Sequence, residues 1–483
     1  MPDDEQHHVR SAGSRVGALL LVVALLLGAA GGALWWRGDL DSLFGPSELP
    51  GASALDVPAP EGLDLPSPRA ARPVLEEPSG GPVSATELRR RLNPLLRRPR
   101  FGRRVGLAVH DLGSDRTVLQ VGSGAYLPAS TLKLLTAAGV LELLGPGHRF
   151  ETRVTLTGAL RAVPTVTLVG GGDPMLTTRT DDAYPRPASL HELVTRTSRA
   201  LADAGARRVR VGFDDTLFTG PAVSPAWEPT YVPDVAGPVS ALWVDEGIDP
   251  ATSARSEAPA ALAARTFADG LRSRGLRVVD VADQPEPPLP GAEELASVRS
   301  PPLMQVVEHV LGLSDNEGAE VLLRHAGLAA GTGGSFVGGA RAIEQALTPL
   351  GVPWAGVRLY DGSGLSRDNR LPLETLVAVL RLAADDRRPD LRGVLSGLPV
   401  AGFDGTLVGR FYADGTSPAL GLVRAKTGTL TGAHALAGTV VDADGVQLAF
   451  VAVANGVAVR DTLFARDQLD RVAAALAACG CAR

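Results

Sequence analysis

The stretch Ser130-Thr131-Leu132-Lys133 opens an apolar run that continues to about residue 144 and predicts a helix. Its serine and lysine are three residues apart, so on a helix their side chains project from one face, one turn apart. A serine hydroxyl is a weak nucleophile that needs a neighbouring base. Lysine can supply that base when burial lowers its pKa. The spacing alone is a weak signal, because chance produces it every few hundred residues at average composition.

Lysine is almost absent from this chain, which makes its positions informative. The 483 residues include 47 lysines and arginines together, and only Lys133 and Lys426 are lysines. Arginine stays protonated in proteins, whereas a desolvated lysine can lose its proton. We therefore expect both lysines to stand where arginine would not serve. The alternative is two leftover lysines in an arginine-rich composition.

Two further polar stretches have residue types suited to chemistry. Ser314-Asp315-Asn316 lies near a predicted break between two helices, where a hydroxyl could relay a proton and an amide could bond a peptide. Lys426-Thr427-Gly428-Thr429 lies at the end of a predicted edge strand, where an ammonium and two hydroxyls would bind a carboxylate. Gly428 would permit a close approach of backbone and ligand. Taken singly, a helix cap and a solvent-facing strand end explain these stretches at least as well.

Hydrophobic periodicity predicts a chain of mixed helices and strands. A capping box at Ser84 predicts the first folded helix, and Asp444-Gly445 predicts a hairpin turn. Residues 301–386 are predicted to be largely helical. Predicted strands cover residues 105–112, 118–122, parts of 151–173, 209–213, 276–281, 423–429, 435–442 and 446–455, and further helices cover 190–204, 260–274 and 462–478.

Together the polar motifs resemble a known signature. The order Ser-x-x-Lys, Ser-x-Asn, Lys-Thr-Gly is similar to that of penicillin-binding proteins and class A β-lactamases. From about residue 84 to 478 the chain resembles the low-molecular-mass class C penicillin-binding proteins, the D-alanyl-D-alanine carboxypeptidase/endopeptidase type with a large insertion after the first motif. Further segments that carry this resemblance are Gly171-Gly172-Asp173-Pro174, Tyr360-Asp361-Gly362-Ser363-Gly364-Leu365-Ser366-Arg367, Leu398-Pro399-Val400-Ala401-Gly402 and Asp404-Gly405-Thr406-Leu407.

The resemblance implies an α/β (α+β) fold class. It implies a β-lactamase/transpeptidase-like domain with a central five-stranded antiparallel sheet flanked by helices, split by an inserted α/β domain. We place the first part of this domain at residues 84–150, the insertion at 151–293 and the second part at 294–483. This insertion is shorter than the family's full two-domain insertion, so we expect its second domain to be reduced or missing.

The resemblance also implies roles for the motif residues. Ser130 is the expected nucleophile and Lys133 its base, and Ser314 relays a proton to the leaving group. Backbone N–H groups of Ser130 and Thr429 form the expected oxyanion hole. Arg367 is a candidate for binding a charged end of the peptide stem, against a structural role in its turn. The expected substrate-binding residues of the second and third motifs are Asn316, Lys426, Thr427, Gly428 and Thr429.

The implied reaction is the trimming of peptidoglycan stem peptides through an acyl-enzyme on Ser130, which β-lactam antibiotics would also acylate. Carboxypeptidase and DD-endopeptidase activity stay unseparated, because both cleave after a D-Ala carbonyl. One alternative is a β-lactamase-like hydrolase, which needs a carboxylate to activate the deacylating water. Glu374 is a candidate for that carboxylate, although no suitable Asn follows it. The other alternative is a non-catalytic penicillin-binding wall module or sensor.

The N-terminal region predicts a position outside the cytoplasm for the body of the protein. Residues 16–36 are apolar and uncharged, enough to cross a bilayer as a helix. Arg10 and Arg15 before them, and Trp35-Trp36 at the far edge, indicate insertion with the N-terminus inside. We expect a retained anchor with residues 1–15 in the cytoplasm, and a cleaved signal peptide is the alternative. The proline-rich residues 37–83 predict an extended stalk.

Composition argues against other classes of partner. The net charge of −6 gives no general attraction to nucleic acid. The two cysteines, Cys479 and Cys481, cannot form a closed zinc site, so we predict no metal and no cofactor. We expect them to be free thiols, or a local disulfide if the tail is oxidised. The arginine-rich residues 89–100 predict a solvated helix face, with contact to an anionic wall polymer or lipid as the alternative.

Overall fold

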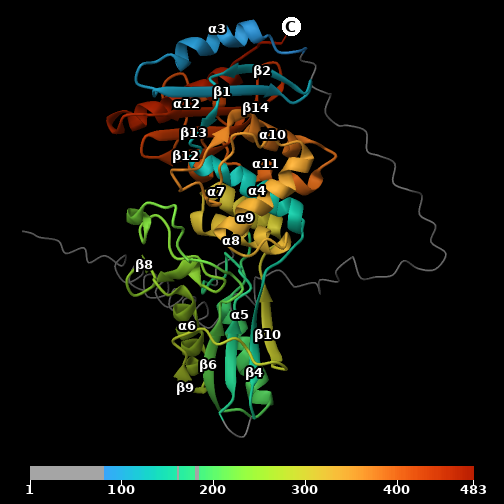
Figure 1. Cartoon of the computed structure of the whole chain (residues 1–483), viewed down its shortest axis with the longest axis vertical. Coiled ribbons are helices and arrows are strands. Elements are labelled where there is room, and N and C mark those ends of the chain that lie inside the picture. The colour runs from blue at the N-terminus through green and yellow to red at the C-terminus, as the bar shows by residue number, and fades with distance from the viewer. Residues whose placement is uncertain (1–80, 160–162, 180–183, 483) are drawn as a thin grey trace, which may run out of the picture. The chain divides into compact units, whose positions relative to one another are not determined.

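The computed structural model describes residues 81–159, 163–179 and 184–482, which belong to one compact unit (Figure 1). Among these residues no helix is both long enough and apolar enough to cross a membrane. The predicted cytoplasmic segment 1–15, the predicted anchor or signal peptide 16–36 and nearly all of the predicted stalk 37–83 lie outside the described residues.

The central element is a five-stranded sheet in which every neighbouring pair of strands is antiparallel. This confirms the sheet that the resemblance implies. Its first strand in the sequence pairs with its last, so the sheet is complete only when the chain up to residue 455 has joined it. In spatial order its strands are β12 (Val423–Leu430), β13 (Ala433–Val441), β14 (Gln447–Asn455), β1 (Arg104–Asp111) and β2 (Arg116–Val121).

Helices cover both faces of this sheet (Figure 1). Successive side chains of a strand point to opposite faces. Leu107 and Val109 of β1 accordingly pack into the core that contains α3 (Ala85–Leu96) and α12 (Thr462–Ala477), whereas Ala108 belongs to the core on the other face. The predicted cap is confirmed, because Ser84 accepts a hydrogen bond from the Glu87 N–H at the start of α3.

The core on the other face is a cluster of helices around α4 (Lys133–Leu144). This helix is apolar on all sides and is buried from Lys133 to Leu141, as expected for an interior helix. The surrounding helices are α7 (Leu303–Leu313), α8 (Asn316–Ala329), α9 (Phe336–Leu347), α10 (Leu373–Ala384) and α11 (Gly393–Ser396).

The prediction of a largely helical stretch to residue 386 is wrong for residues 351–370, which contain no helix. A buried carboxylate organises this segment instead of helical hydrogen bonds. Asp361 accepts from the Gly364 N–H at 3.0 Å and from the Asn369 side-chain amide at 2.7 Å. This segment passes directly beside the first motif, because the Ser363 carbonyl binds Lys133 and Gly364 lies against Ala129.

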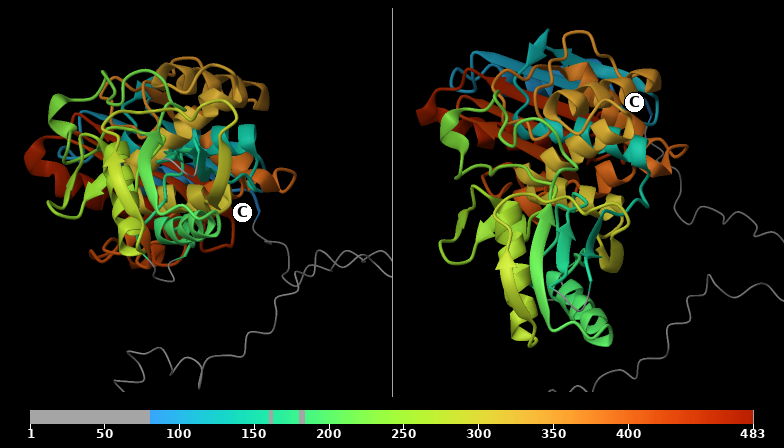
Figure 2. Two further views of the ribbon diagram at one scale, coloured as in Figure 1. Left: turned by 90° about the horizontal axis from the view of Figure 1, so that it is seen from below. Right: turned by 60° about the horizontal axis from the view of Figure 1, so that its bottom comes forward.

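A second sheet lies between α4 and α7 in the sequence and carries two helices, α5 (Leu190–Asp203) and α6 (Pro259–Ser273) (Figure 2). Glu151 pairs with Arg299, so the chain leaves the helix cluster and returns to it at adjacent positions. The predicted boundary after residue 293 falls at the beginning of the strand Glu293–Arg299, which carries the chain back to the helix cluster. The strand order is β10 (Glu293–Arg299), β4 (Glu151–Thr157), β5 (Thr165–Val169), β6 (Arg208–Asp214) and β9 (Arg277–Val281).

This sheet is mixed. The helix-then-strand units that end in β6 and β9 give parallel pairs, and the pairs of β4 with β5 and with β10 are antiparallel. Two short ribbons complete the strands: β3 (Ala125–Tyr126) with β11 (Leu371–Pro372), and β7 (Ile248–Asp249) with β8 (Ala254–Arg255).

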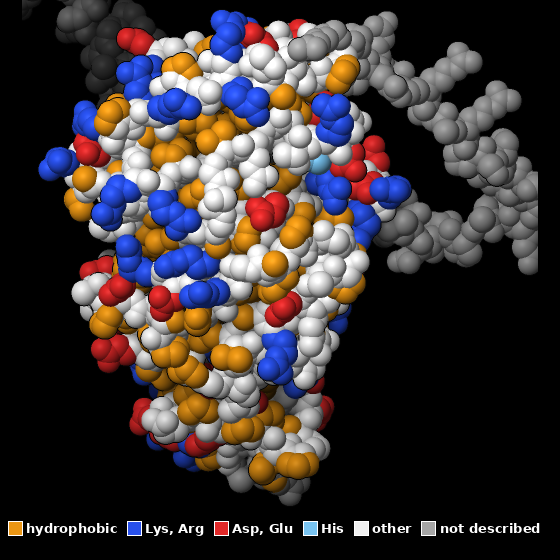
Figure 3. Space-filling model, turned by 45° about the horizontal axis from the view of Figure 1, so that its top comes forward, with side chains coloured by type: hydrophobic (Ala, Val, Ile, Leu, Met, Phe, Trp, Pro, Cys, Tyr) orange, Lys and Arg blue, Asp and Glu red, His pale blue; other side chains and the backbone are white. Residues whose placement is uncertain are grey.

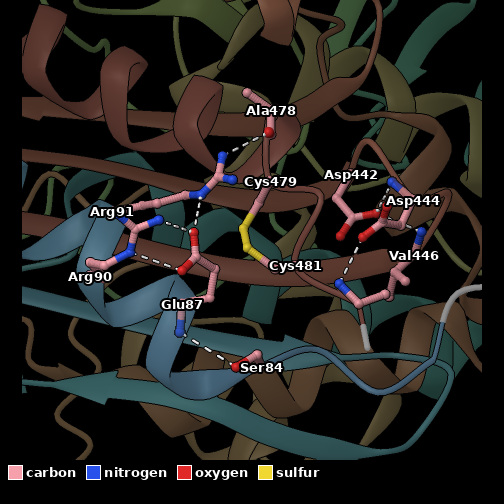
Figure 4. The surroundings of a disulfide bond; sticks show 11 residues. Ser84, Glu87, Arg90, Arg91, Asp442, Asp444, Val446, Ala478, Cys479 and Cys481 are labelled. Carbon is pink, nitrogen blue, oxygen red and sulfur yellow. Dashed lines mark hydrogen bonds and ion pairs between the residues drawn. A yellow bond between two sulfur atoms is a disulfide. The ribbon is translucent and has the colours of Figure 1, made fainter.

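The two ends of the described chain meet beside α3 (Figure 4). Cys479 and Cys481 form a disulfide, so the expectation of free thiols is wrong and the alternative of a local disulfide is observed. The Ser84 N–H donates to the Cys481 carbonyl at 2.9 Å. In α3, Arg90 and Arg91 both bind Glu87, which lowers the pKa of that carboxyl to about 2. These two arginines therefore form the solvated, ion-paired helix face that the sequence predicts.

Candidate active site

Ser130 lies in a single 3-10 turn, Ala129–Leu132, that leads into α4. Ala129 has φ +47°, a left-handed conformation that non-glycine residues seldom adopt. Two glycines allow other backbone segments to approach this turn. A Cβ atom on Gly364 would lie 2.0 Å from the Ala129 carbonyl oxygen, and one on Gly428 would lie 2.7 Å from the Pro128 carbonyl oxygen. The third motif and residues 360–367 thus press against the turn that holds Ser130.

The Lys133 ammonium is the centre of the site. Its Nζ donates to Ser130 Oγ at 3.1 Å, to Asn316 Oδ1 at 2.8 Å and to the Ser363 carbonyl at 2.8 Å. All three donors of the ammonium are therefore used. Burial lowers the pKa of Lys133 to about 8, while the negative charges of Glu320 and other nearby carboxyl groups oppose this shift. Near neutral pH a neutral lysine 3.1 Å from the serine hydroxyl is accessible.

The second motif spans the junction of α7 and α8. Ser314 ends α7 with φ +62°, and Asp315 caps α8 by accepting from the Gly318 N–H at 2.9 Å. Asn316 both accepts from Lys133 and donates to the Val235 carbonyl at 3.1 Å. The structure therefore joins Asn316 to the first motif. The Ser314 hydroxyl forms no hydrogen bond with any described residue.

The third motif lies on β12, which is an edge strand as predicted. Lys426 is fully buried and donates to the Thr427 carbonyl at 3.0 Å. Burial, with the nearby charge of Lys133, lowers the pKa of Lys426 well below its usual value. The Thr427 hydroxyl donates to Thr406 Oγ1 at 3.0 Å, and the side chain of Thr429 is exposed.

Arg367 lies where residues 360–367 meet the end of β12. Its Nη2 donates to the Thr431 carbonyl at 2.9 Å, and its Nε lies 3.9 Å from the Glu228 carboxylate. More than a third of the side chain is exposed, at 37%. The guanidinium thus joins residues 360–367 to the turn that follows β12, and it still has free donors for a ligand.

Two buried carboxyl groups, Glu320 and Asp361, support the site, and the sequence predicted no role for either of them. Glu320 accepts from the Gly362 and Ser363 N–H groups at 2.7 and 2.9 Å, which fixes the carbonyl that binds Lys133. Burial, reinforced by the charge of Asp361, raises the pKa of Glu320 to about 8. The available signal was an acidic residue one turn after Asn316 in an otherwise apolar stretch of α8.

The inserted segment also reaches the site. The Trp227 indole N–H donates to Asp361 at 2.9 Å, and the Gly237 N–H donates to Glu317 at 3.1 Å. Arg255 forms an ion pair with the same Glu317, whose side chain is buried. The insertion therefore contacts the start of α8 and the segment that contains Asp361, which the sequence could not indicate.

Among the described residues, one group of side chains has the chemistry to hold a metal ion. Glu246, His309 and Asp315 each offer one ligand atom, and these atoms lie within 4.8 Å of one another. Asp315 is at the same time the cap of α8, which accounts for it without an ion. The absence of a metal stays a prediction.

A serine and a buried lysine at the start of an interior helix, with a Lys-Thr-Gly edge strand of an antiparallel sheet beside them, define the serine acyl-transferases of the β-lactamase/transpeptidase-like fold. Comparison with known sequences specifies the family. The chain belongs to the D-Ala-D-Ala carboxypeptidase 3 (S13) family, whose sequence model matches residues 88–257 and 249–476.

Named relatives cover most of the chain. Carboxypeptidase Rv3627c of Mycobacterium tuberculosis is 36% identical over 79% of this chain and 82% of its own length. A D-alanyl-D-alanine carboxypeptidase of Actinomadura is 31% identical over 80% of this chain and 84% of its own. The crystal structure of penicillin binding protein 4 (dacB) from Haemophilus influenzae matches with a TM-score of 0.65 at 21% identity, covering 81% of this chain and 98% of that one. This last likeness supports the fold class.

Proposed function

We propose that this protein is a serine-type D-Ala-D-Ala carboxypeptidase that trims peptidoglycan stem peptides through an acyl-enzyme on Ser130. Membership of the S13 family supports the reaction class. The observation that carries the residue assignment is the 3.1 Å hydrogen bond between Lys133 Nζ and Ser130 Oγ, together with a lysine pKa lowered to about 8. A base with a pKa near the working pH is suited to taking the serine proton.

The first half of the reaction forms the acyl-enzyme. Neutral Lys133 takes the proton of Ser130 as its oxygen attacks the carbonyl of the penultimate D-Ala. The negative charge on that carbonyl oxygen is bound by the backbone N–H groups of Ser130 and Thr429. The C–N bond then breaks, and D-Ala leaves with a proton that passes through the Ser314 hydroxyl.

Substrate binding falls to the second and third motifs. The side-chain amide of Asn316 bonds the peptide, and Lys426 with the hydroxyls of Thr427 and Thr429 binds the terminal carboxylate. Gly428 keeps this strand close to the nucleophile turn. Arg367 uses its free donors on a charged group of the stem. Water then hydrolyses the ester on the serine and restores its hydroxyl.

The decisive experiment measures D-Ala release from a pentapeptide stem by the wild type and by Ser130→Ala. We expect release by the wild type, none by the variant, and labelling by penicillin only where the serine is present. A wild type that binds labelled penicillin but releases no D-Ala would instead establish the sensor alternative. Incubation with monomeric and cross-linked muropeptides, followed by mass analysis, separates carboxypeptidase from endopeptidase activity.

The β-lactamase alternative finds little support around its candidate carboxylate. Glu374 is exposed in the first turn of α10 and forms no hydrogen bond with any described residue. We therefore expect penicillin to stay attached to Ser130. Rapid release of hydrolysed drug would contradict this assignment.

The proposed substrate places the enzyme outside the cytoplasm. We propose that residues 16–36 direct it there, as a membrane anchor or as a cleaved signal peptide. Fractionation of cells that make the full chain, with N-terminal sequencing of the product, tests both forms.

A further inference from the structure

A second polar site adjoins the end of β12. A cavity of about 730 Å³ is lined there by six arginines and one aspartate, a formal charge of +5 in a chain whose net charge is −6. Figure 3 shows many basic side chains on the upper half of the face it displays. The charged residues of this arginine cavity are Arg100, Arg103, Arg104, Arg367, Arg370, Arg460 and Asp461.

Half of the six arginines, Arg103, Arg104 and Arg370, form no ion pair with a described residue, and a fourth, Arg367, lies 3.9 Å from the carboxylate of Glu228 outside the cavity lining. Asp461 accepts from Arg100 Nε at 2.6 Å and lies 3.9 Å from Arg460 Nε. Arg370 donates only to backbone carbonyls, at 2.7 and 2.8 Å. Arg103 forms no hydrogen bond with any described residue and extends across Gly456, where an added Cβ would lie 3.0 Å from its Nε. Within the cavity, Asp461 is thus the carboxylate partner of two of the six guanidinium groups.

A larger cavity elsewhere in the molecule shows that arginines need not be left unpaired. This cavity of about 1070 Å³ contains Asp115, Arg381, Asp385 and Arg387 in its lining. Arg381 pairs with Asp115 at 3.2 Å, and Arg387 pairs with Asp385 at 2.8 Å. Both arginines of that lining are ion-paired with aspartates, whereas three of the six arginines of the arginine cavity are not.

The arginine cavity shares three segments with the candidate active site. Gly432 and Ala433 follow the third motif, Arg367 follows the segment that binds Lys133, and Leu127 stands three residues before Ser130. Asn455 binds Leu127 through both backbone groups, at 2.8 and 3.2 Å. The lining of the arginine cavity therefore lies next to the turn that holds Ser130.

The direction of the substrate leads toward this cavity. In the proposed function the terminal carboxylate lies at Lys426 and Thr427, and the carbonyl under attack lies at Thr429. The rest of the stem must then continue past Leu430, in the direction of Gly432. Leu430 is the last residue of β12 and pairs with Ala433 across the hairpin turn, so the lining of the cavity begins directly beyond the strand that holds the substrate.

We propose that the arginine cavity binds an oxyanion-bearing segment of the wall polymer that carries the stem peptide, beyond the part that the catalytic groups hold. This inference rests on the proposed function, which supplies the polymer. Guanidinium groups bind carboxylates and phosphates with paired hydrogen bonds, so either group on the polymer fits. The cavity then keeps the enzyme on its polymeric substrate without touching the reacting atoms.

The test compares two double variants with the same change of charge. Arg103→Gln/Arg460→Gln removes two arginines of the cavity, and Arg199→Gln/Arg341→Gln removes two exposed arginines that bond no described residue. Both are made in the Ser130→Ala background, so that the polymer is not cut, and their binding to isolated cell-wall sacculi is measured by co-sedimentation. Penicillin labelling of the same variants with Ser130 present verifies that the catalytic turn is folded.

At low ionic strength we expect the cavity variant to bind sacculi about tenfold more weakly, with less than about a twofold change in the control. Amidation of the sacculi with carbodiimide abolishes the difference if carboxylates are bound, and removal of phosphodiester polymers by acid abolishes it if phosphates are bound. Equal binding by the two variants, or a difference that survives both treatments, overturns the proposal. Failure of the proposed function is distinct, because it appears as absent D-Ala release by the wild type.

Discussion

The surroundings of the two lysines differ although both side chains are buried, at 1% and 0% exposure. Lys133 meets a hydroxyl, an amide oxygen and a backbone carbonyl, with buried carboxyl groups behind them. Lys426 has one carbonyl acceptor, and the charged group that most affects it is Lys133 itself. Lys133 can therefore hold a proton and release it. Lys426 lacks a negative partner until a ligand supplies one.

This difference separates two kinds of buried cation. A buried charge is tolerated when hydrogen bonds and opposite charges replace water. Lys133 has that replacement in the free protein, so its protonation can serve as part of the reaction. Lys426 lacks it, so a substrate carboxylate would stabilise its charged form.

The largest effect is expected for Lys133→Arg. Arginine cannot give up its proton at working pH, so Ser130 loses its base and acylation by labelled penicillin should slow by about 10³-fold. Circular dichroism and thermal unfolding verify that the variant is folded. An acylation rate within tenfold of the wild type would remove the base assignment and, with it, the contrast.

The next effect is the pH dependence of the wild type. The active form of Lys133 is neutral, and its pKa is lowered to about 8, so the acylation rate should rise as pH passes through 8. Between pH 6 and pH 8 the neutral fraction grows about 50-fold, and the rate should grow with it. Stopped-flow labelling with a chromogenic β-lactam measures this profile. A flat profile across this range would show that another group takes the serine proton.

The sequence predicted the separate strands and the motifs because both are local patterns, whereas the assembly of the strands into one antiparallel sheet was implied by the family resemblance. Period-two alternation identified β12, β13 and β14, and Ser130 with Lys133 needs only helical spacing to come together. The scarcity of lysine then singled out the pair. The strand and motif patterns each lie within about ten residues of chain, whereas the scarcity of lysine is a property of the whole sequence.

The supporting shell could not be predicted in the same way. Glu320 acts through backbone N–H groups of Gly362 and Ser363, and no side-chain pattern records such contacts. Trp227 and Val235 reach the site from the insertion, 134 and 81 residues of sequence away from their respective partners Asp361 and Asn316. These contacts depend on how segments pack, which periodicity does not encode.

A moderate effect is expected for Lys426→Arg, which keeps the charge but enlarges a fully buried side chain. Overpacking destabilises such sites by about 1–3 kcal/mol, and the carboxylate contact is displaced. We expect kcat/KM for a carboxylate-bearing peptide to fall about tenfold, mostly through KM. The pH profile of acylation should keep its midpoint. A shifted midpoint would mean that the two lysines act as one titrating unit.

The smallest effect is expected for Glu320→Gln, which tests the groups behind Lys133. Burial raises the pKa of Glu320 to about 8, so its carboxyl becomes charged only as the pH rises through 8, and there its charge raises the pKa of Lys133. Replacing it should therefore move the upper part of the rise of the acylation rate to lower pH. The glutamine oxygen can still accept from one of the two N–H groups, and losing the other should lower the free energy of unfolding by about 1–2 kcal/mol. Urea unfolding measures the loss, and the pH profile of labelling measures the shift. A loss of stability with an unmoved profile would make Glu320 a support for the Gly362 and Ser363 backbone alone, whereas a shift of the upper part of the profile to lower pH shows that the ionised form of Glu320 raises the pKa of Lys133.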